Sequence, residues 1–331
     1  MVGRFRATPR THALAEFDTV NLIFSQWWMM MINVVCACDA NFVPHMATML
    51  LSLVENNRRH SIRIFVLCDD ALPSHEMLAT MLHGHPAEFS LVPVGEALPQ
   101  ALFVSNHISR AAYARLLMGE VLPPEIDRVL YLDCDLIIRG DLDDLWNTNL
   151  SDKTIGAVRE TDEYYWRSRL GLPPGAPYFN SGVMLVDLRR WRKMEIGRRS
   201  LDFVREHPER LQYWDQCALN LMLHDDWMPL ESKWNFQSMA VGVVDHGIIR
   251  FRQVPRRIRD MVRVVHFTTG SKPWHYMNYH PFKGEYLEYR RRTPWPLEPF
   301  QDRYPHNIIR RFLHRYLPPL LPLYLEVRKI I

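Results

Sequence analysis

Between Ile32 and residue 140, short apolar runs alternate with segments whose apolar residues recur at helical spacing. The expected strands cover residues 32–39, 62–70, 89–94 and 128–140, and the expected helices cover residues 43–57, 74–84 and 109–123. Strands that alternate with helices pair mostly in parallel, and the helices then cover both faces of the sheet. The alternation therefore predicts an α/β fold with a mixed, mostly parallel sheet, whose ligands lie beyond the carboxyl ends of the strands.

The second half of the chain is more mixed. Residues 178–188 are expected to form a turn and then a strand, and residues 189–206 a basic amphipathic helix. A further helix is expected over 214–224, and a late strand over 262–268. We expect all these elements to belong to one domain that spans residues 32–285.

The two terminal segments differ from this domain. Residues 1–31 end in an apolar run that is too short for a membrane span and lacks a secretory cleavage site. Because the run ends in three methionines that could each start translation, we expect an N-terminal extension that is either disordered or introduced by an upstream start codon. Residues 286–331 hold nine basic and four acidic residues among aromatic and leucine side chains. This tail is expected either to pack on the body as a solvated basic helix or to contact a membrane surface peripherally.

Charge and cysteine content limit the remaining classes of protein. A formal net charge of +3 is too mild for nucleic acid to be the main partner. The five cysteines are odd in number and show no Cys-x-x-Cys spacing, so neither a disulfide framework nor a zinc ribbon fits. They are expected to be buried free thiols of a cytoplasmic protein, whose tail could lie on the inner face of the cytoplasmic membrane.

Asp133 and Asp135 flank Cys134 inside the apolar run VLYLDCDLII. Carboxylates are costly to bury without a partner, and side chains two residues apart on a strand point to one face. With a local bend at the strand end, both can reach one divalent cation that also holds a nucleotide diphosphate. The alternative is a turn with two solvated aspartates, which the apolar residues on both sides disfavour.

His266 follows the apolar run VRVV, where an isolated histidine is usually a core residue. Its neighbours favour a different role. Gly270 allows close approach of the backbone to a ligand, and Lys272 offers a cation for phosphate oxygens. The three residues within a short segment favour a site for a metal-bound diphosphate.

Asp39, Asn41 and Phe42 follow the first expected strand. The two polar side chains can hydrogen-bond a base or ribose, and the aromatic ring can stack on a base. The same residues could instead cap the next helix and pack an aromatic ring against it.

Asp215 and Gln216 stand at the start of an expected helix, where Asp215 could simply be an N-cap or first-turn acid. Asn180 begins Asn-Ser-Gly, which by itself reads as a turn before a strand. Neither Asp215-Gln216 nor Asn180-Ser181-Gly182 identifies a functional site by itself, so the function of these residues can be inferred only together with other segments of the chain.

Several longer segments follow one another in a recognisable order: VVCACDANF, AAYARLLMGEVLP, VLYLDCDLIIRGDLDDLW, YFNSGVMLVDLRRWR, YWDQCALN, KWNF and HFTTGSKPWH. Over residues 32–280 the chain resembles glycosyltransferase family 8, and in particular its bacterial lipopolysaccharide galactosyl- and glucosyltransferases. Ordered motifs are far more specific than a lone Asp-x-Asp. The resemblance implies a GT-A fold, which is a Rossmann-like α/β domain, and a Mn²⁺ (or Mg²⁺) cofactor.

The resemblance also implies a set of site residues. The implied metal ligands are Asp133, Asp135 and His266. The residues implied for the nucleotide and the donor are Asp39, Asn41, Phe42, Arg115, Cys134, Gly270 and Lys272. Those implied for the donor sugar and acceptor are Asn180, Glu160, Asp215 and Gln216.

This chain departs from the family pattern at three positions. The family more often has Thr or Ala where this chain has Cys134, a change that we expect to be harmless. Ala40 replaces a second aspartate, so the base contact is left to Asp39. Family members often carry Asp at the position of Glu160.

The implied activity is retaining transfer of galactose or glucose from a UDP-sugar to a saccharide or glycolipid acceptor. In one route Gln216 or Asp215 forms a covalent intermediate. In the other the leaving phosphate takes the acceptor's proton on the same face of the sugar, which we favour because glutamine is a poor nucleophile.

Two other functions are weighed against this one. A sugar nucleotidyltransferase would need a Gly-rich phosphate loop, which CACDANFVPH lacks. A non-catalytic carbohydrate-binding protein would not need Asp-x-Asp, His266 and Lys272 together. No residue decides between galactose and glucose as the donor sugar.

Overall fold

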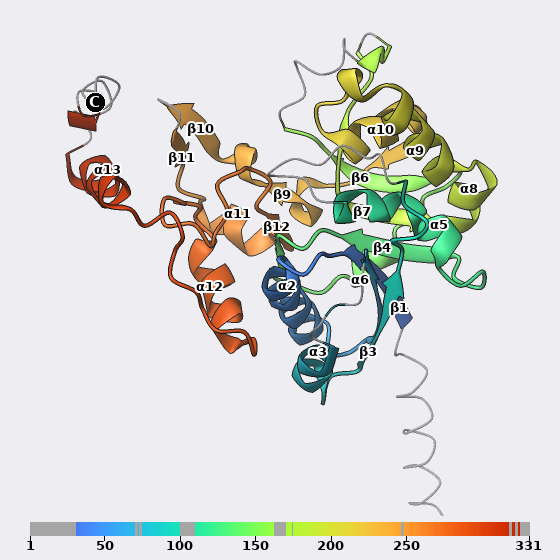
Figure 1. Ribbon diagram of the computed structural model, residues 1–331, viewed down its shortest axis with the longest axis horizontal. Coiled ribbons are helices and arrows are strands. Elements are labelled where there is room, and N and C mark those ends of the chain that lie inside the picture. Colours follow the sequence, from blue (N-terminus) through green and yellow to red (C-terminus); the bar gives the residue numbers. More distant parts are fainter. Residues whose placement is uncertain are drawn as a thin grey trace, which may run out of the picture.

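The computed structural model describes residues 31–69, 72, 75–99, 110–161, 170–173, 175–245, 248–317, 320–321 and 324. The expected N-terminal extension therefore lies outside the described residues, apart from Met31. A large sheet and a small sheet carry the fold, and helices pack on both faces of the large sheet (Figure 1).

The large sheet has seven strands in the order β3-β2-β1-β4-β7-β6-β8. The strands are β1 (Met31–Ala37), β2 (Ser61–Cys68), β3 (Ala87–Pro93), β4 (Arg128–Leu132), β6 (Ile155–Arg159), β7 (Phe179–Asp187) and β8 (Trp227–Pro229). Among these described strands β7 alone runs against the others, because its pairings with β4 and β6 are antiparallel and the remaining pairings are parallel. The expected α/β fold with a mostly parallel sheet is confirmed.

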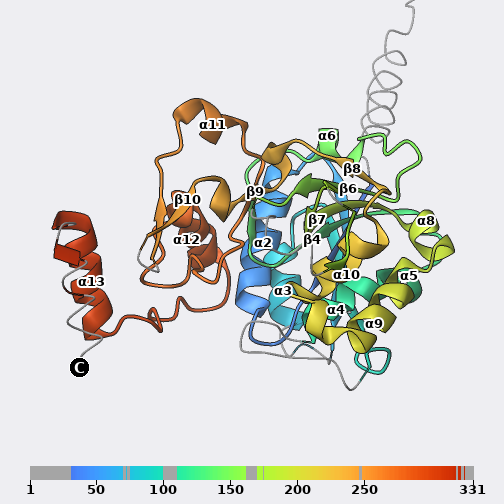
Figure 2. The same cartoon turned by 90° about the horizontal axis from the view of Figure 1, so that it is seen from above.

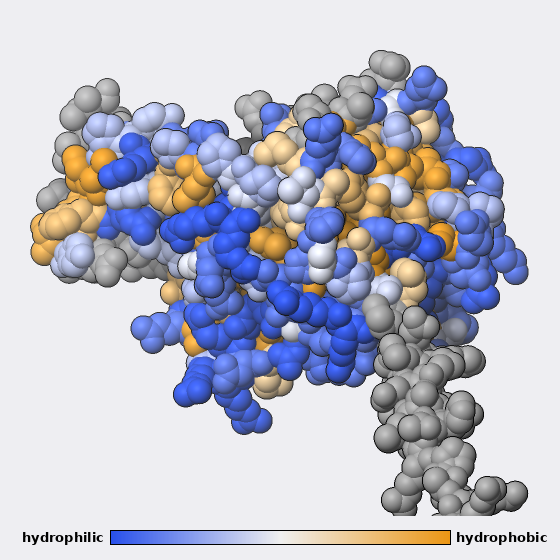
Figure 3. All heavy atoms as spheres, turned by 90° about the horizontal axis from the view of Figure 1, so that it is seen from below, coloured by the Kyte–Doolittle hydropathy of each residue, from blue (hydrophilic) through white to orange (hydrophobic). Residues whose placement is uncertain are grey.

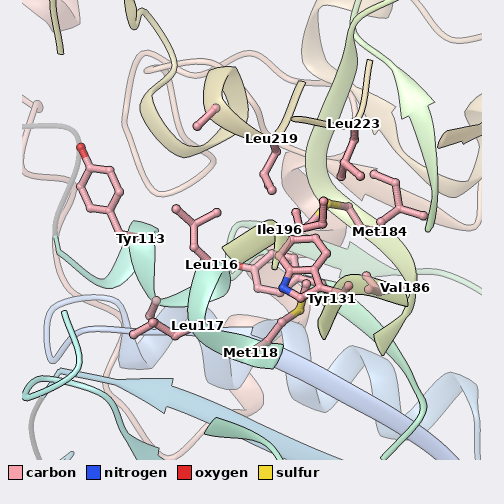
Figure 4. Close-up of a cluster of buried hydrophobic side chains, with 14 of the residues drawn as sticks. Tyr113, Leu116, Leu117, Met118, Tyr131, Met184, Val186, Ile196, Leu219 and Leu223 are labelled. Carbon is pink, nitrogen blue, oxygen red and sulfur yellow. The ribbon is translucent and has the colours of Figure 1, made fainter. Parts of the chain in front are cut away.

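The central strands are apolar on both sides, so each face of the sheet needs a helical cover. On one face, Val34 and Leu130 pack with α2 (Val43–Asn56) and α3 (His75–Leu82). On the other, Val35 and Tyr131 pack with a helical layer that Figure 4 shows in part. That layer consists of α4 (Ala111–Ala114), the 3-10 turn η1 (Arg115–Leu117), α5 (Met118–Val121), α8 (Leu188–Lys193), α9 (Ile196–Glu206) and α10 (Trp214–Met222). All five cysteines are buried free thiols, as expected.

The small sheet has the order β5-β12-β9, with β5 (Leu136–Ile138), β12 (Val264–His266) and β9 (Phe236–Gln237). The expected single strand over 128–140 is wrong, because the chain leaves the large sheet after β4 and enters the small one at β5. Asp133 N donates to Gly182 O of β7 at 2.9 Å, whereas Asp135 O accepts from Phe267 N, just after β12, at 3.1 Å. The chain thus changes hydrogen-bond partners within three residues.

Two further expectations need correction. Asn180-Ser181-Gly182 is not a turn but part of β7, where Asn220 of α10 holds the start of the strand by accepting from Phe179 N. The expected helix over 189–206 is divided into α8 and α9, because Glu195 between them is left-handed with φ 53°.

The remaining elements are short. They are α6 (Asp143–Trp146), η2 (Pro208–Arg210), η3 (Ser232–Trp234), η4 (Ser238–Ala240), α11 (Arg256–Met261) and the antiparallel pair β10 (Gly242–Asp245) and β11 (Ile248–Phe251). The 3-10 turn η3 leads directly into β9 and so delivers residue 235 to the small sheet.

Two helices follow the sheets. α12 (Lys283–Arg292) crosses the expected boundary at residue 285 and is held to α2 through Tyr286, whose hydroxyl lies 2.6 Å from His45 Nδ1. α13 (Pro305–Tyr316) lies apart from the large sheet (Figures 1 and 2), and Arg311 ties it to the carbonyl of Tyr276.

The outer surface of α13 is apolar. Ile308, Ile309, Phe312 and Tyr316 are 42%, 47%, 53% and 61% exposed. Figure 3 shows apolar side chains beside hydrophilic ones at the end of the molecule that α13 occupies. Across the described part of the chain, no helix has the length and apolar character needed to cross a membrane.

Two glycines at the second position of a helix allow a matched test of packing. A Cβ on Gly197 of α9 would lie 1.9 Å from Leu116 O, whereas a Cβ on Gly284 of α12 meets nothing within 4 Å. Gly197→Ala is expected to destabilise the protein by roughly 1–3 kcal/mol through overpacking. Gly284→Ala should stabilise it by about 0.5–1 kcal/mol. Urea unfolding measures both, and equal effects in the two variants would contradict the packing of α9 on η1.

Candidate active site

Asp133, Asp135 and His266 come together where the chain crosses between the two sheets. His266 Nε2 lies 3.2 Å from Asp135 Oδ1 and 3.6 Å from Asp133 Oδ2. One atom from each of the three residues lies within 4.8 Å of the other two, so the group could hold a metal ion. Two carboxylates and an imidazole form a ligand set that suits a divalent cation. The structure therefore brings together the two acids and the histidine that the sequence predicts as metal ligands.

Positive side chains compensate the two acids. Lys272 Nζ lies 2.5 Å from Asp135 Oδ2 and donates to Phe267 O at 2.7 Å. Burial alone would raise the pKa of Asp135, but Lys272 and His266 outweigh burial and hold this pKa well below its usual range. Asp135 is therefore ionised under ordinary conditions and remains available as an anionic ligand.

Arg115 of η1 links Asp133 to the second acid of the site. Its guanidinium lies 2.8 Å from Asp133 Oδ1 and 2.9 Å from Asp215 Oδ2, and it donates to Ser181 Oγ at 3.0 Å. It also lies over the ring of Tyr131 at 4.6 Å. Burial raises the pKa of Asp215 to about 6, although Arg115 acts against this shift. Arg115 thus couples the candidate cation site to the start of α10.

A hydrogen-bonded amide and acid group lies beside Arg115. Gln216 Oε1 accepts from Ser181 N at 3.0 Å, so its amide nitrogen faces Glu160 Oε2 at 3.3 Å. Asn180 Nδ2 donates to the same Glu160 oxygen at 2.9 Å. The four residues that the sequence predicts for the sugar region, Asn180, Glu160, Asp215 and Gln216, therefore gather around β7 and α10.

The loop after β1 places Asp39, Asn41 and Phe42 together before α2. Asp39 Oδ1 accepts from Asn41 N at 2.9 Å and from Phe42 N at 3.2 Å, so one carboxylate oxygen orders the turn. Phe42 is 37% exposed and meets Trp274 edge to face, with ring centroids 5.8 Å apart. Asp39 therefore stabilises the turn before α2, while the ring of Phe42 remains partly exposed to solvent.

Trp274 and His45 form an aromatic support that sequence reasoning missed. Their rings stack with centroids 3.5 Å apart. Burial lowers the pKa of His45 to about 3, and Arg290 adds to this shift, so the stacked imidazole is neutral. Trp274 lies in the segment HFTTGSKPWH, two residues after Lys272, and its closeness to that lysine was the available signal.

Two other missed residues border His266. A Cβ on Gly182 would lie 2.2 Å from His266 Cε1 and 2.6 Å from Asp133 Oδ2, so only glycine leaves room for both. Asn235 is 1% exposed, and its Oδ1 lies 3.0 Å from His266 Nδ1. A glycine inside an apolar strand often marks a close approach, which is the signal that Gly182 offered.

Cys134 and Gly270 are placed differently from the other predicted donor residues. The thiol of Cys134 donates to Ala37 O at 3.1 Å and is buried in the core on the α2 side of the sheet. Its side chain therefore faces away from the acids, and only its backbone borders the site. A Cβ on Gly270 would meet nothing within 4 Å, so its backbone adjoins open space.

A second group of possible metal ligands, His60, Asp141 and Asp143, lies near α6. Arg59 lies 2.7 Å from Asp141 Oδ2 and 3.5 Å from Asp143 Oδ2, and His60 Nε2 lies 3.2 Å from Asp141 Oδ1. One guanidinium already pairs with both acids, so the group is explained as an ion-pair network.

The chain is similar in sequence to a known protein family and to individual known proteins. The model of glycosyl transferase family 8 matches residues 33–278. General stress protein A of Bacillus subtilis (strain 168) is 30% identical over 80% of this chain and 94% of its own. Lipopolysaccharide 1,2-glucosyltransferase of Escherichia coli (strain K12) is 24% identical over 88% of each chain.

Solved structures give the same result. The galactosyltransferase LgtC in complex with donor and acceptor sugar analogs is 27% identical over 80% of this chain and 97% of its own, with a TM-score of 0.66. An active-site mutant of LgtC gives a TM-score of 0.69 at 26% identity, with the same coverage. Because the family model covers well over half of the residues and the fold agrees, the chain belongs to glycosyl transferase family 8 and is a glycosyltransferase.

Proposed function

We propose that this enzyme transfers galactose or glucose, with retention of configuration, from a UDP-sugar to a saccharide or glycolipid acceptor in the assembly of lipopolysaccharide or another surface glycan. The names of its relatives, a lipopolysaccharide glucosyltransferase and a galactosyltransferase, support the substrate class. The observation that carries the proposal is the meeting of Asp133, Asp135 and His266 beside two cationic side chains. Such a site suits the diphosphate of a nucleotide sugar.

Asp133, Asp135 and His266 would hold Mn²⁺ (or Mg²⁺), and their short mutual distances and mixed oxygen and nitrogen donors support this assignment. The bound cation would neutralise charge that develops on the leaving diphosphate. Lys272 would exchange its contact with Asp135 for a phosphate oxygen, because both are anionic acceptors for the same ammonium group.

The loop after β1 would hold the nucleoside. Phe42 offers an exposed ring for stacking on uracil, and Trp274 supports that ring from the side. Asp39 keeps one carboxylate oxygen in the turn, so the other oxygen and the side chain of Asn41 would bind the base or ribose. Near the phosphates, contacts from Cys134 and Gly270 would come through the backbone.

Arg115, Asn180, Glu160, Asp215 and Gln216 would orient the donor sugar and the acceptor. The same-face route is supported by how the two candidate nucleophiles are held. Gln216 Oε1 already accepts from Ser181 N, and Asp215 is ion-paired with Arg115 at 2.9 Å. Both interactions draw electron density from the oxygens that would have to attack the sugar. The leaving phosphate is then the base that takes the acceptor's proton.

α13 would contact the membrane at its surface and bring the enzyme to a lipid-linked acceptor at the cytoplasmic face. The helix carries three arginines and no acid, and its outer side chains are apolar. Basic residues favour anionic headgroups, while isoleucine, phenylalanine and tyrosine enter the interface.

A donor panel tests the reaction. With Mn²⁺ and an acceptor, UDP release is expected from UDP-galactose or UDP-glucose and much less from UDP-N-acetylglucosamine, because the site is proposed for a simple hexose. A nucleotidyltransferase would instead form a UDP-sugar and pyrophosphate from UTP and a sugar phosphate. Binding of the sugar nucleotides without UDP release would contradict the proposal and favour a binding protein.

The metal ligands can be tested separately. Asp133→Ala is expected to lower UDP release by at least about 100-fold, because charge on the leaving group is no longer stabilised. Excess chelator should have the same effect on the unaltered enzyme. Asp143→Ala, in the Arg59-paired group, is the control and should keep full activity. If the control loses activity and Asp133→Ala keeps it, the metal is held by His60, Asp141 and Asp143, and the proposed metal ligands are wrong.

Membrane contact is tested with lipid vesicles. Ile309→Glu combined with Phe312→Glu is expected to weaken binding to anionic vesicles by roughly tenfold or more, since each apolar side chain contributes about 1.5 kcal/mol or more when buried. Ile258→Glu combined with Met261→Glu on α11, where the two side chains are 44% and 51% exposed, is the matched control. Flotation with anionic and zwitterionic vesicles measures the effect, and unchanged flotation of the α13 variant would count against this contact.

A further inference from the structure

A chain of hydrogen bonds runs from the backbone of β7 to the ring of His266. Gly182 N donates to Asn180 Oδ1 at 3.0 Å, and Asn235 Nδ2 approaches the same oxygen at 2.8 Å. On its other side Asn235 Oδ1 lies 3.0 Å from His266 Nδ1. Asn180, Asn235 and His266 are 6%, 1% and 3% exposed, so solvent is largely excluded from the chain.

The donors and acceptors of this chain follow from its first member. A backbone N–H can only donate, so the Asn180 side-chain atom that faces Gly182 N must be the oxygen. The Asn235 atom that faces this oxygen must then be the NH₂ group, which leaves the Asn235 oxygen facing the imidazole. An amide oxygen can only accept, so His266 Nδ1 must carry a proton.

The other end of Asn180 agrees with this assignment. Its Nδ2 donates to Glu160 Oε2 at 2.9 Å, and a carboxylate accepts. Reversing the Asn180 amide would set its oxygen against Glu160 and its NH₂ against Gly182 N–H. Two unfavourable contacts would replace two hydrogen bonds, which disfavours the reversed orientation.

We propose that Asn235 is a positioning residue that keeps the proton of His266 on Nδ1 and thereby leaves the Nε2 lone pair directed at the cation. The inference rests on the proposed metal role of Asp133, Asp135 and His266. Partners of the second ring nitrogen commonly set the tautomer of a metal-binding histidine. Here the partner is a buried amide, oriented by a backbone donor on another sheet.

Backbone hydrogen bonds hold Asn235 in the position from which its side chain contacts His266. The residue ends η3, where its N–H donates to Ser232 O, and the next residue, Phe236, begins β9. Phe236 pairs with Val265, directly before His266. Asn235 therefore lies directly before β9, and His266 ends the neighbouring strand β12 of the small sheet.

Removal of the amide should shift the proton. In Asn235→Ala, Nδ1 loses its acceptor, and the proton can move to Nε2, which faces Asp135 Oδ1 at 3.2 Å. A cation must then displace that proton. Affinity for Mn²⁺ in the presence of UDP is expected to fall by about 10-fold to 100-fold, the usual effect of losing such a partner.

Two further variants separate positioning from folding. Asn235→Asp keeps an acceptor for Nδ1 but loses the donor to Asn180, so it should melt at a lower temperature and yet bind Mn²⁺ within about threefold of the unaltered enzyme. Asn57→Ala removes an equally buried asparagine that accepts from Leu142 N, far from the site, and should lose stability without losing Mn²⁺ affinity. Equal losses of affinity in the Ala and Asp variants at Asn235, or a similar loss in Asn57→Ala, would overturn the inference.

His266→Ala, measured beside these variants, separates this inference from the proposed function. If His266→Ala binds Mn²⁺ as tightly as the unaltered enzyme, His266 is not a metal ligand, and both the proposed metal site and this inference are wrong. If it binds weakly while Asn235→Ala binds normally, the metal centre stands and the inference alone is wrong.

A spectroscopic readout is independent of metal and activity. In nitrogen-15 correlation spectra of the metal-free enzyme at mildly alkaline pH, the His266 signal is identified by its loss in His266→Ala. Its Nδ1 is expected to be protonated in the unaltered enzyme and in Asn235→Asp, and unprotonated in Asn235→Ala. An unprotonated Nδ1 in the unaltered enzyme would refute the proposal.

Discussion

The charge of two aspartates, separated by one residue, organises much of this structure. Asp133 and Asp135 stand where the chain passes from the large sheet to the small one, and carboxylates at such a depth need partners. Arg115 from η1, Lys272 from the loop after β12 and His266 from β12 supply them. The convergence of these distant segments follows from this need, and it joins the two sheets at the candidate active site.

Arg115 connects what would otherwise be two separate sites. It pairs with Asp133 in the candidate cation site and with Asp215 in the region proposed for the sugar, at nearly equal distances. Because it is buried and also lies over Tyr131, it has little freedom to leave either acid. A change of charge at one acid is therefore felt at the other, which suits an enzyme that must coordinate a leaving diphosphate with an incoming acceptor.

The sequence predicted much of this arrangement, and its failures have physical causes. Alternating apolar runs predicted the parallel strands, because a strand buried on both faces has a distinctive composition. The division of 128–140 between two sheets was missed, since apolar periodicity does not show which strand a residue pairs with. The resemblance to a known family implied that Asp133, Asp135 and His266 would meet. Asn235 and Trp274 were not predicted as site residues, because their roles depend on neighbours that only the tertiary structure brings close.

The reversed direction of β7 has a consequence for the chemistry of the sheet edge. In a wholly parallel sheet, every strand would present its carboxyl end, and hence its last residues, to a ligand. β7 instead arrives at that edge with its first residues, so an incoming strand lies against the outgoing end of β4. There Asp133 N donates to Gly182 O, and because Gly182 has no Cβ, the side chains of Asp133 and His266 can approach the entering strand. One inverted strand therefore places the amino-terminal end of β7 beside the carboxyl-terminal end of β4, at the edge where the candidate site lies.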